Sequence, residues 1–415
     1  MYEWSDTDII MRDTVREFID KEIRPNLDAL ESGELSPYPI ARKLFSEFGV
    51  DVLAAEAIKT MLDKERAKRE GSGTENREKS GGIGELGAHA SMAVAMVSEI
   101  SGVSIGLLST VGVSLGLGAA TIMSRGTLAQ KERWLPDLMT LGKIAAWAIT
   151  EPDAGSDAFG GMKTYVKRDG EDYILNGQKT FITNGPYADV LIVYAKLDEG
   201  DGADKRNRPV LTFVLDAGMP GLTQGKPFKK MGMMSSPTGE LFFDKVRLTP
   251  DRLLGETELH AGGDGRASAK SNFVAERVGV AALSLGIIDE CHRLCVDYAK
   301  TRTLWGREIG QFQLIQLKLA KMEIARINVQ NMVFNVLERV KDGKLPTLAE
   351  ASAIKLYSSE TATDVAMDAV QLFGGNGYMA EYRVEQLARD AKSLMIYAGS
   401  NEVQVTHIAK GLLAG

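Results

Sequence analysis

One carboxylate stands out because of its setting. Glu276 lies within residues 273–288, a run whose other members are almost all apolar. A positioned carboxylate can act as a general base and take a proton from carbon. The run predicts a helix that is buried on most sides, with Glu276 in about its first turn. A carboxylate there can also be stabilised by the helix N-terminus or by a salt bridge. The residue types alone leave both roles open.

A second group of residues could hold a pyrophosphate. Arg302 offers a planar fork that can grip two phosphate oxygens at once. Residues 371–378 read QLFGGNGY, and their glycines allow the backbone to approach a phosphate and donate N–H groups. A glycine-rich turn alone is more often a helix C-cap. A Rossmann site is excluded, because a helical pattern and no strand precedes these glycines.

Two segments in the middle of the chain could pack against a flat ring with a polar edge. Residues 147–157, WAITEPDAGSD, form an apolar run that ends in a polar turn. Residues 176–185, NGQKTFITNG, contain two Asn-Gly pairs. A flavin needs such a combination of aliphatic packing with a few backbone and hydroxyl groups. The structural alternatives are a strand end with a turn at Pro152 for the first segment, and two linked hairpins for the second.

Other patterns carry little chemistry. Cys291 and Cys295 are four residues apart, but no further cluster of cysteine or histidine completes a metal site, so we expect buried helix packing. Residues 112–116 read GVSLG without the preceding strand that a hydrolase elbow needs. Met233 and Met234 are predicted to fill the core rather than to contact a substrate.

Three blocks of the chain must position these residues. Residues 1–145 are predicted to be helical, residues 146–255 to form a small β-barrel or sandwich, and residues 256–415 to be helical again. Residues 63–83 are charged and glycine-rich, which predicts a mobile loop after a solvated helix end. Residues 91–122 are predicted to be a buried helix pair rather than a membrane span.

The composition sets outer limits on function. The chain has 415 residues and a net charge of −7, which argues against non-specific binding of nucleic acid. Two cysteines give no disulfide framework and suit a reducing compartment. The acidic N-terminus lacks the apolar core of a signal peptide and the arginines of a transit peptide. We therefore expect a cytoplasmic, bacterial protein with neither a nucleic-acid nor a membrane partner.

Taken together, the motifs resemble those of the acyl-CoA dehydrogenases, strongly over residues 85–415 and weakly over residues 1–30. The family fold is an N-terminal helical domain, a β-domain and a C-terminal four-helix bundle. The matching segments are residues 147–157 (T-E-P-x-A-G-S-D), 176–185 (N-G-x-K-x-W/F-I-T-N-G), 230–238 (K-x-G-x-x-x-S-x-T), 302–313 (R-x-x-F-G…Q), 371–377 (Q-x-x-G-G-x-G) and 381–391 (E-x-x-x-E-x-x-x-R-D-A).

The resemblance fails at one decisive position. The family segment Y-E-G-T-x-Q carries the usual catalytic Glu, but here Ala398 stands in its place. The isovaleryl-CoA and long-chain branch of the family has its base at the helix position of Glu276, so the resemblance assigns the base to Glu276. The backbone N–H of Ala398 would still bind the thioester carbonyl. That branch also has an Asp two residues before the base, where this chain has Val274; Asn272 is the candidate replacement.

The resemblance also implies two binding sites and no metal. Thr150 would bond the flavin edge, Phe181 would pack on the ring, and Thr183 would lie near its reactive nitrogen. The FAD site would consist of Trp147, Ile149, Thr150, Phe181, Thr183, Arg302, Trp305, Gln313, Gln371, Gly374, Gly375, Ser400 and Glu402, with those from Arg302 to Gly375 serving a neighbouring subunit. The acyl-CoA site would include Ser156, Ser236, Arg277, Tyr397 and Gly399.

The activity implied is FAD-dependent dehydrogenation of an acyl-CoA to the trans-2-enoyl-CoA. An electron-transfer flavoprotein would accept the electrons, and a homotetramer would be the assembly. Breakdown of fatty acids or branched-chain amino acids is the expected setting. An acyl-CoA oxidase and a non-catalytic, DNA-binding flavoprotein of the same fold are the alternatives. Oxygen consumption would reveal the first, and a gel shift at physiological salt the second.

Overall fold

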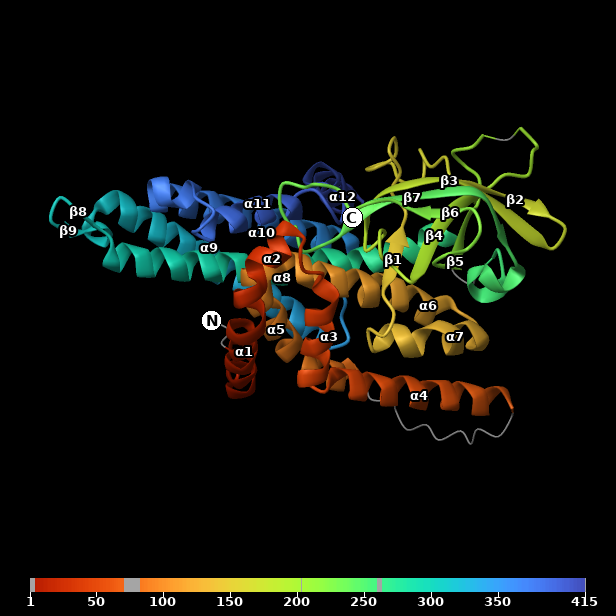
Figure 1. The fold of residues 1–415 in the computed structure, drawn as a ribbon, viewed down its shortest axis with the longest axis horizontal. Coiled ribbons are helices and arrows are strands. Elements are labelled where there is room, and N and C mark those ends of the chain that lie inside the picture. Colours follow the sequence, from red (N-terminus) through yellow and green to blue (C-terminus); the bar gives the residue numbers. More distant parts are fainter. Residues whose placement is uncertain (1–3, 71–82, 203, 260–262, 415) are drawn as a thin grey trace.

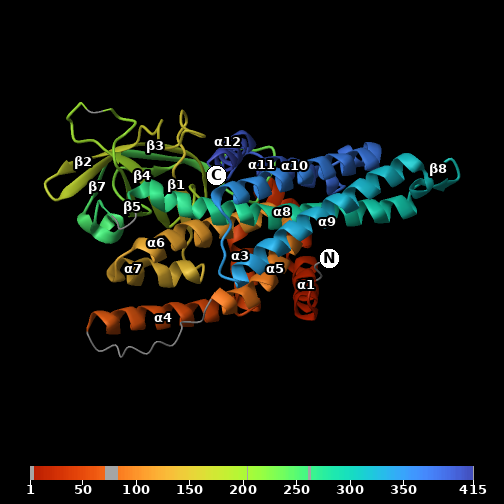
Figure 2. The ribbon, with the colours of Figure 1, turned by 180° about the vertical axis from the view of Figure 1, so that it is seen from behind.

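The computed structural model describes residues 4–70, 83–202, 204–259 and 263–414. Along the chain a helical block is followed by a β-sheet block and then by a second helical block (Figure 1). The sheet occupies one end of the molecule, and long C-terminal helices run from it toward the other end, as the reverse view also shows (Figure 2).

The first block contains seven α-helices in the described residues. They are α1 (Asp6–Phe18), α2 (Leu27–Ser32), α3 (Pro37–Glu47), α4 (Val50–Arg69), α5 (Ile83–Gly112), α6 (Ala120–Arg125) and α7 (Leu128–Met139).

Helix α4 corrects one prediction from the sequence. Residues 63–69, expected to be loop, continue this helix to Arg69. Lys, Glu, Arg and Ala are good helix formers even where little is buried. The helix is also tied to α7 by the Lys131–Glu65 ion pair at 2.9 Å and by a contact between Arg66 and Glu132. The remainder of the expected loop, residues 71–82, lies outside the described residues.

The apolar run at residues 91–122 consists of two helical parts that meet at a kink, which agrees with the predicted helix pair. Helix α5 bends at Ser104 (φ −150°, ψ 87°) and continues through a π-helical segment, Val113–Ala119, into α6. By length and composition alone, the described stretch Ala90–Arg125 passes the test for a membrane span, as many core helices of soluble proteins do, and 56% of its most apolar window is buried.

The middle block is one curled sheet of seven strands. They are β1 (Ala145–Ala148), β2 (Tyr165–Asp169), β3 (Asp172–Thr183), β4 (Val190–Leu197), β5 (Val210–Asp216), β6 (Leu222–Gln224) and β7 (Thr238–Leu248). The strand order is β1-β4-β2-β3-β7-β6, and β5 pairs with β4. Strand β4 is buried along its whole length, because a continuous apolar run suits a strand covered on both faces.

The C-terminal block supplies the long helices. They are α8 (Gly265–Thr301), α9 (Gln313–Lys341), α10 (Leu348–Phe373), α11 (Val384–Leu394) and α12 (Asn401–Leu413). A two-stranded hairpin of β8 (Thr303–Leu304) and β9 (Arg307–Glu308) joins α8 to α9 at the tip farthest from the sheet (Figure 1). One apolar core is shared by α8, α9, α10 and α11, and it includes Leu285, Val329, Ala366 and Leu387.

Candidate active site

Glu276 lies in the middle of a helix, which corrects its predicted place near a helix start. Helix α8 begins at Gly265, capped by the Asp264 carboxylate, so Glu276 is its twelfth residue and far from the N-terminal N–H groups. The side chain is half-buried and makes no hydrogen bond or ion pair with any other described residue. Burial raises the pKa of Glu276 to about 7, against smaller opposing effects of the Arg277 and Lys355 charges. A helix-cap or salt-bridge role for this carboxylate is therefore wrong.

The next residue connects α8 to the turn that contains Ala398. The buried Arg277 donates from Nε to the Ala398 carbonyl at 3.4 Å and from Nη1 to Ser352 Oγ at 3.1 Å. Ala398 and Gly399 both have left-handed backbone, with φ of 57° and 82°. A Cβ on Gly399 would lie 2.8 Å from Gln404 Nε2, so the turn needs glycine at this position.

Two side chains that sequence analysis missed hold the same turn from behind. Lys355 on α10 donates to the Gly399 carbonyl at 2.9 Å, and Gln404 on α12 donates to the carbonyls of Ala398 (3.1 Å) and Gly399 (2.7 Å). A signal for Lys355 does exist in the sequence. It shares one helical face with small residues, namely Ala351, Ser352, Ser358, Ser359 and Ala362, all of them buried.

This arrangement leaves donors available on the turn. The backbone N–H groups of Ala398 and Gly399 donate to no protein atom within the described part of the chain, and Ala398 is buried. An unpaired, buried N–H group is uncommon because it costs free energy. The turn can therefore donate to a carbonyl oxygen close to Glu276. Beyond it, Ser400 is the N-cap of α12 and the exposed Glu402 is in its first turn.

The β-domain meets α8 one turn before Glu276. The Trp147 ring on β1 packs edge-on against Phe273, with ring centroids 6.1 Å apart. The Arg277 guanidinium in turn lies 5.6 Å from the centre of the Phe273 ring. The indole Nε1 of Trp147 is buried and has no hydrogen-bond partner among the described residues.

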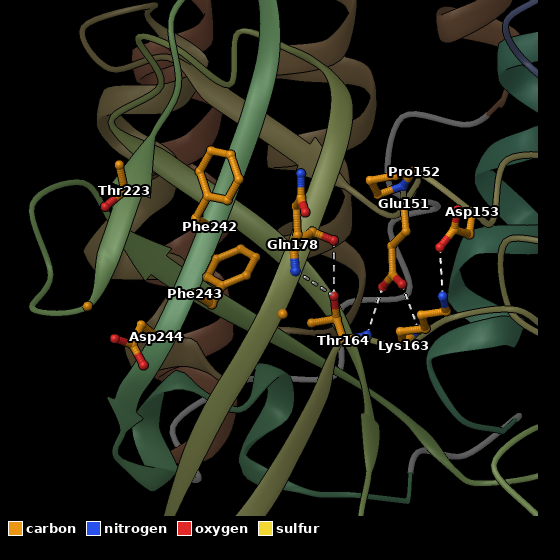
Figure 3. A pocket seen from close by; sticks show the side chains of 12 residues that line it. Glu151, Pro152, Asp153, Lys163, Thr164, Gln178, Thr223, Phe242, Phe243 and Asp244 are labelled. Carbon is orange, nitrogen blue, oxygen red and sulfur yellow. Dashed lines mark hydrogen bonds and ion pairs between the residues drawn. The ribbon is translucent and has the colours of Figure 1, made fainter.

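A buried ion pair joins the two segments that were predicted to contact a flavin. Lys179 on β3 donates to Glu151 Oε1 at 2.8 Å and to the Ile149 carbonyl at 3.0 Å. The N–H of Thr180 also donates to the Thr150 carbonyl at 2.9 Å. The Glu151 carboxylate accepts N–H groups of Lys163 and Thr164, as Figure 3 shows. Residues 149–151 are thus fixed against residues 179–180.

The Asn-Gly pairs do not form two linked hairpins, so that alternative is wrong. Residues 172–183 are one strand, β3, with two irregularities in its pairing with β7. The second irregularity falls between Lys179 and Ile182 and gives Phe181 a left-handed backbone (φ 57°). The Phe181 ring is 67% exposed, and Thr183 pairs with Thr238 at the strand end. Bulges commonly re-aim a side chain in this way.

The predicted CoA loop, residues 230–238, is fixed against helices on both sides. Ser235 Oγ lies 2.8 Å from Ser104 Oγ at the α5 kink, and Asp390 on α11 accepts the Met233 N–H. Ser236 is 1% exposed, and its hydroxyl has no partner among the described residues. Met233 packs into the core of the C-terminal helices, which confirms the packing role predicted for it.

Ser156 lies on the exposed side of the β-domain, after a tight turn at Pro152. That turn confirms the expected strand end followed by a turn. A surface pocket of about 500 Å³ lies beside it, lined by residues such as Glu151, Lys163, Gln178 and Phe242 (Figure 3). Neither Glu276 nor Ala398 borders this pocket.

The predicted cofactor residues fall into two separate groups within one chain. Arg302 follows Glu276 by 26 residues along α8, which corresponds to about 39 Å at 1.5 Å per residue. Trp305 in the β8–β9 hairpin is 88% exposed. Near this end, Asn376 donates to the Tyr298 hydroxyl at 3.0 Å, just after Gly374 and Gly375. The distal group thus comprises Arg302, Trp305, Gln313, Gln371, Gly374 and Gly375.

Several features found in the sequence are structural. Cys291 and Cys295 are fully buried free thiols, and the described residues contain no group of three side chains suited to a metal. Residues 112–116 are helical, so no hydrolase elbow exists there.

Glu385 and Arg389 form the expected i,i+4 pair at 2.7 Å on α11. Asn272 donates to Thr121 Oγ1 at 3.1 Å.

Comparisons with known proteins identify the family. Three family models match, described as the N-terminal (residues 5–141), middle (146–246) and C-terminal (263–413) domains of acyl-CoA dehydrogenase. An acyl-CoA dehydrogenase of Bacillus subtilis is 35% identical over 407 residues, covering 98% of each chain. The mitochondrial isovaleryl-CoA dehydrogenase of Pongo abelii is 37% identical over 311 residues, covering 75% of this chain and 71% of that protein.

Solved structures agree with these matches. The butyryl-CoA dehydrogenase of Megasphaera elsdenii superposes with a TM-score of 0.83 at 32% identity, over 100% of both chains. The chain itself has a helical block, then a curled β-sheet, then a second helical block. The chain belongs to the acyl-CoA dehydrogenase family and is an FAD-dependent oxidoreductase.

Proposed function

We propose that the chain dehydrogenates an acyl-CoA thioester to the trans-2-enoyl-CoA, with Glu276 as the catalytic base. The assignment rests on one observation: the Glu276 carboxylate has no hydrogen-bond or ion-pair partner among the described residues. It belongs to the same cluster as Arg277, Lys355 and the turn at Ala398. A base that must accept a proton from carbon needs to be free in this way.

The acidity of Glu276 suits the task. Because burial raises its pKa to about 7, the carboxylate is a stronger base than an exposed glutamate, yet it is still ionised in a large fraction of molecules at neutral pH. A positioned general base contributes roughly 10²–10⁴-fold to the rate of a proton transfer. The Glu276 carboxylate would take the α-proton and hold it as the neutral acid.

The turn would supply the second part of the chemistry. Taking an α-proton from a thioester places negative charge on the carbonyl oxygen. The buried Ala398 N–H, which no protein acceptor occupies in the described chain, would donate to that oxygen. A single donor of this kind can contribute ~3 kcal/mol. Donation uses only the backbone, so the loss of the usual glutamate side chain at this position leaves it intact.

The residues near this centre fit FAD. Trp147 has a buried indole N–H without a protein partner, and Phe181 presents an exposed ring from a left-handed backbone. With Ile149, Thr150 and Thr183 they would hold the flavin ring, and Ser400 and Glu402 would lie at the start of α12 beside it. Bound FAD supplies the acceptor for the β-hydrogen, which leaves as hydride. Ser156, Ser236, Tyr397 and Gly399 would contact the acyl-CoA.

We further propose a homotetramer in which the distal group serves a neighbouring subunit. A distance of about 39 Å along α8 separates Arg302 from Glu276, so one chain cannot direct both groups at the same reacting atoms. Arg302, Trp305 and Gln313 would therefore bind the FAD diphosphate and adenosine of a partner. An electron-transfer flavoprotein, in a bacterial cytoplasm, is the proposed electron acceptor.

A substrate panel tests the proposed function. The purified protein is expected to be yellow, to contain FAD, and to lose its flavin absorbance anaerobically with one or more straight or branched acyl-CoA thioesters. Each mole of bleached flavin should yield one mole of enoyl-CoA, and adding the electron-transfer flavoprotein should restore the colour. A colourless protein that FAD cannot reconstitute, or bleaching by none of the thioesters, would exclude the proposed reaction.

A further inference from the structure

Lys355 is a buried cation with an unusual set of partners. Its side chain is 0% exposed, and Nζ donates to the Gly399 carbonyl at 2.9 Å and to Asn401 Oδ1 at 2.8 Å. Among the residues whose burial is described, Lys179 is the other lysine at 0% exposure, and it has a carboxylate partner, Glu151, at 2.8 Å. Lys355 forms no ion pair within the described chain. A buried charge without a counter-ion is costly, so its presence here calls for a reason.

The contacts of Lys355 define what it can control. Together with Gln404 it fixes the Gly399 carbonyl, while Gln404 and Arg277 fix the Ala398 carbonyl. Peptide groups are planar, so holding these carbonyls fixes the peptide planes that follow Ala398 and Gly399. The Ala398 N–H lies in the peptide plane before Ala398, which joins this fixed segment through the left-handed backbone of Ala398. Lys355 therefore acts on that N–H indirectly, through the Gly399 carbonyl and the backbone between the two groups.

The charges around the turn also support a role for Lys355 in the active site. Arg277 from α8 and Lys355 from α10 face Glu276, with Tyr397 from the turn as the remaining titratable neighbour. Lys355 itself faces Arg277, Glu276, Glu402 and Glu360. The inner cluster thus holds two cations and one carboxylate. When Glu276 accepts a proton, two positive charges remain to face the negative charge that develops on the thioester oxygen, an arrangement that favours the transition state.

We propose that Lys355 is a positioning residue of the active site, which holds the Ala398 N–H toward the thioester oxygen and favours the ionised form of Glu276. This inference rests on the function proposed above. In this proposal Lys355 would not contact substrate or cofactor directly; it would act through the turn and through its charge.

The test compares two substitutions in the FAD-loaded protein. Lys355→Met removes both the hydrogen bonds and the charge, whereas Lys355→Gln keeps a donor for the Gly399 carbonyl without the charge. The rate of anaerobic flavin reduction by the best acyl-CoA is measured from about pH 5.5 to about pH 9. The control is Lys392→Met, which removes an exposed cation from α11 next to the same turn and should leave the profile unchanged.

The pH profile has a defined expected change. In the wild type the rate should rise as Glu276 ionises around its pKa of about 7 and fall as Lys355 loses its proton around its pKa of about 8. Without the Lys355 charge, the carboxylate of Glu276 is less favoured, so the rising limb should shift to higher pH by roughly one unit in both variants. The falling limb should disappear, and the rate at neutral pH should drop about tenfold or more.

Hydrogen exchange gives a readout that needs no substrate. In Lys355→Met the amides of residues 395–404 should exchange faster, while those of the buried strand β4 should not change. Lys355→Gln should retain much of the protection, because it still donates to the turn. This measurement separates the two proposals: if no acyl-CoA bleaches the wild-type flavin, the function fails, but the effect of Lys355 on the turn is still measured.

Several outcomes would overturn the proposal. One is an unchanged rising limb together with unchanged exchange of residues 395–404 in Lys355→Met. Another is a shift of equal size in Lys392→Met, which would make the effect one of net charge alone. If Lys355→Met does not fold, Lys355→Gln supplies the pH profile. Failure of both variants to fold would identify Lys355 as a structural lysine and contradict its role in positioning.

Discussion

The Glu276→Gln protein is expected to bind FAD and acyl-CoA like the wild type and to reduce its flavin at least ~100-fold more slowly. Glutamine keeps the size and hydrogen-bonding capacity of the side chain but cannot accept the α-proton. Stopped-flow absorbance of the flavin under anaerobic conditions measures the rate. Glu381→Gln, which changes an exposed carboxylate on the same C-terminal block, is the matched control and should retain the wild-type rate.

The same substitution should also make the protein more stable at alkaline pH. The pKa of Glu276 is about 7 in the folded state and about 4.5 in a model compound, so the folded state binds more protons between these values. Stability is therefore lost as pH rises from 4.5 through 7, because an unpartnered carboxylate must ionise in a half-buried site that disfavours its charge. Glutamine removes this penalty. Urea denaturation should show Glu276→Gln to be more stable than wild type at about pH 8 and similar to it below about pH 4.

These two results together separate a base from a structural carboxylate. A structural Glu276 would have stabilising partners, so its loss would lower stability at about pH 8 and leave flavin reduction at the wild-type rate. If Glu276 is the catalytic base, the Glu276→Gln protein should combine slow flavin reduction with increased stability, because a catalytic group often lowers the stability of the folded protein.

The largest loss of stability is expected for Lys179→Met. This change leaves the Glu151 carboxylate, 3% exposed, without its cation in the β-domain. Breaking one side of a buried ion pair costs about 3–5 kcal/mol in the free energy of unfolding. Because Lys179 also fixes the Ile149 carbonyl, FAD retention should weaken as well. Urea denaturation and the FAD content of the purified protein measure the two effects.

Lys163→Met is the matched control for this prediction. Lys163 forms an ion pair with Asp153 at 2.6 Å, but both side chains are more than 70% exposed. Solvent screens such a pair, so its loss should cost only about 0–1 kcal/mol. The double variant Glu151→Gln with Lys179→Met should recover part of the lost stability, because no unpaired charge remains buried. Equal losses for Lys179→Met and Lys163→Met would show that burial of the pair does not matter.

Much of the fold follows from local patterns in the sequence. The apolar runs at 190–195 and 211–215 lie in buried strands β4 and β5, because short runs rich in β-branched and aromatic residues fit a covered sheet. The i,i+4 spacing of Glu385 and Arg389 produced the expected ion pair. The alanine at position 398 and the glutamate at position 276 were also visible, since they depend only on which residue occupies each position.

Other features depend on how distant segments pack. Helix α8 begins at Gly265, eight residues before the apolar run that suggested its start at Phe273, because Asp264 caps a polar first turn. Lys355 and Gln404 meet the Ala398 turn only because α8, α10 and α12 converge there. The bulge that exposes Phe181 arises from the pairing of β3 with β7. No local pattern specifies these contacts.

The measurement that tests the central claim most directly is the rate of flavin reduction after the carboxylate has been moved. Glu276→Gly with Ala398→Glu places the base at the turn, where Ala398 already carries a Cβ at φ 57°, so the change adds little backbone strain. If both positions face the same α-carbon, the double variant should reduce flavin at least ~10-fold faster than Glu276→Gly alone, within the range of a positioned base. A Glu276→Gly protein that reduces flavin at the wild-type rate would contradict the assignment of Glu276 as the base.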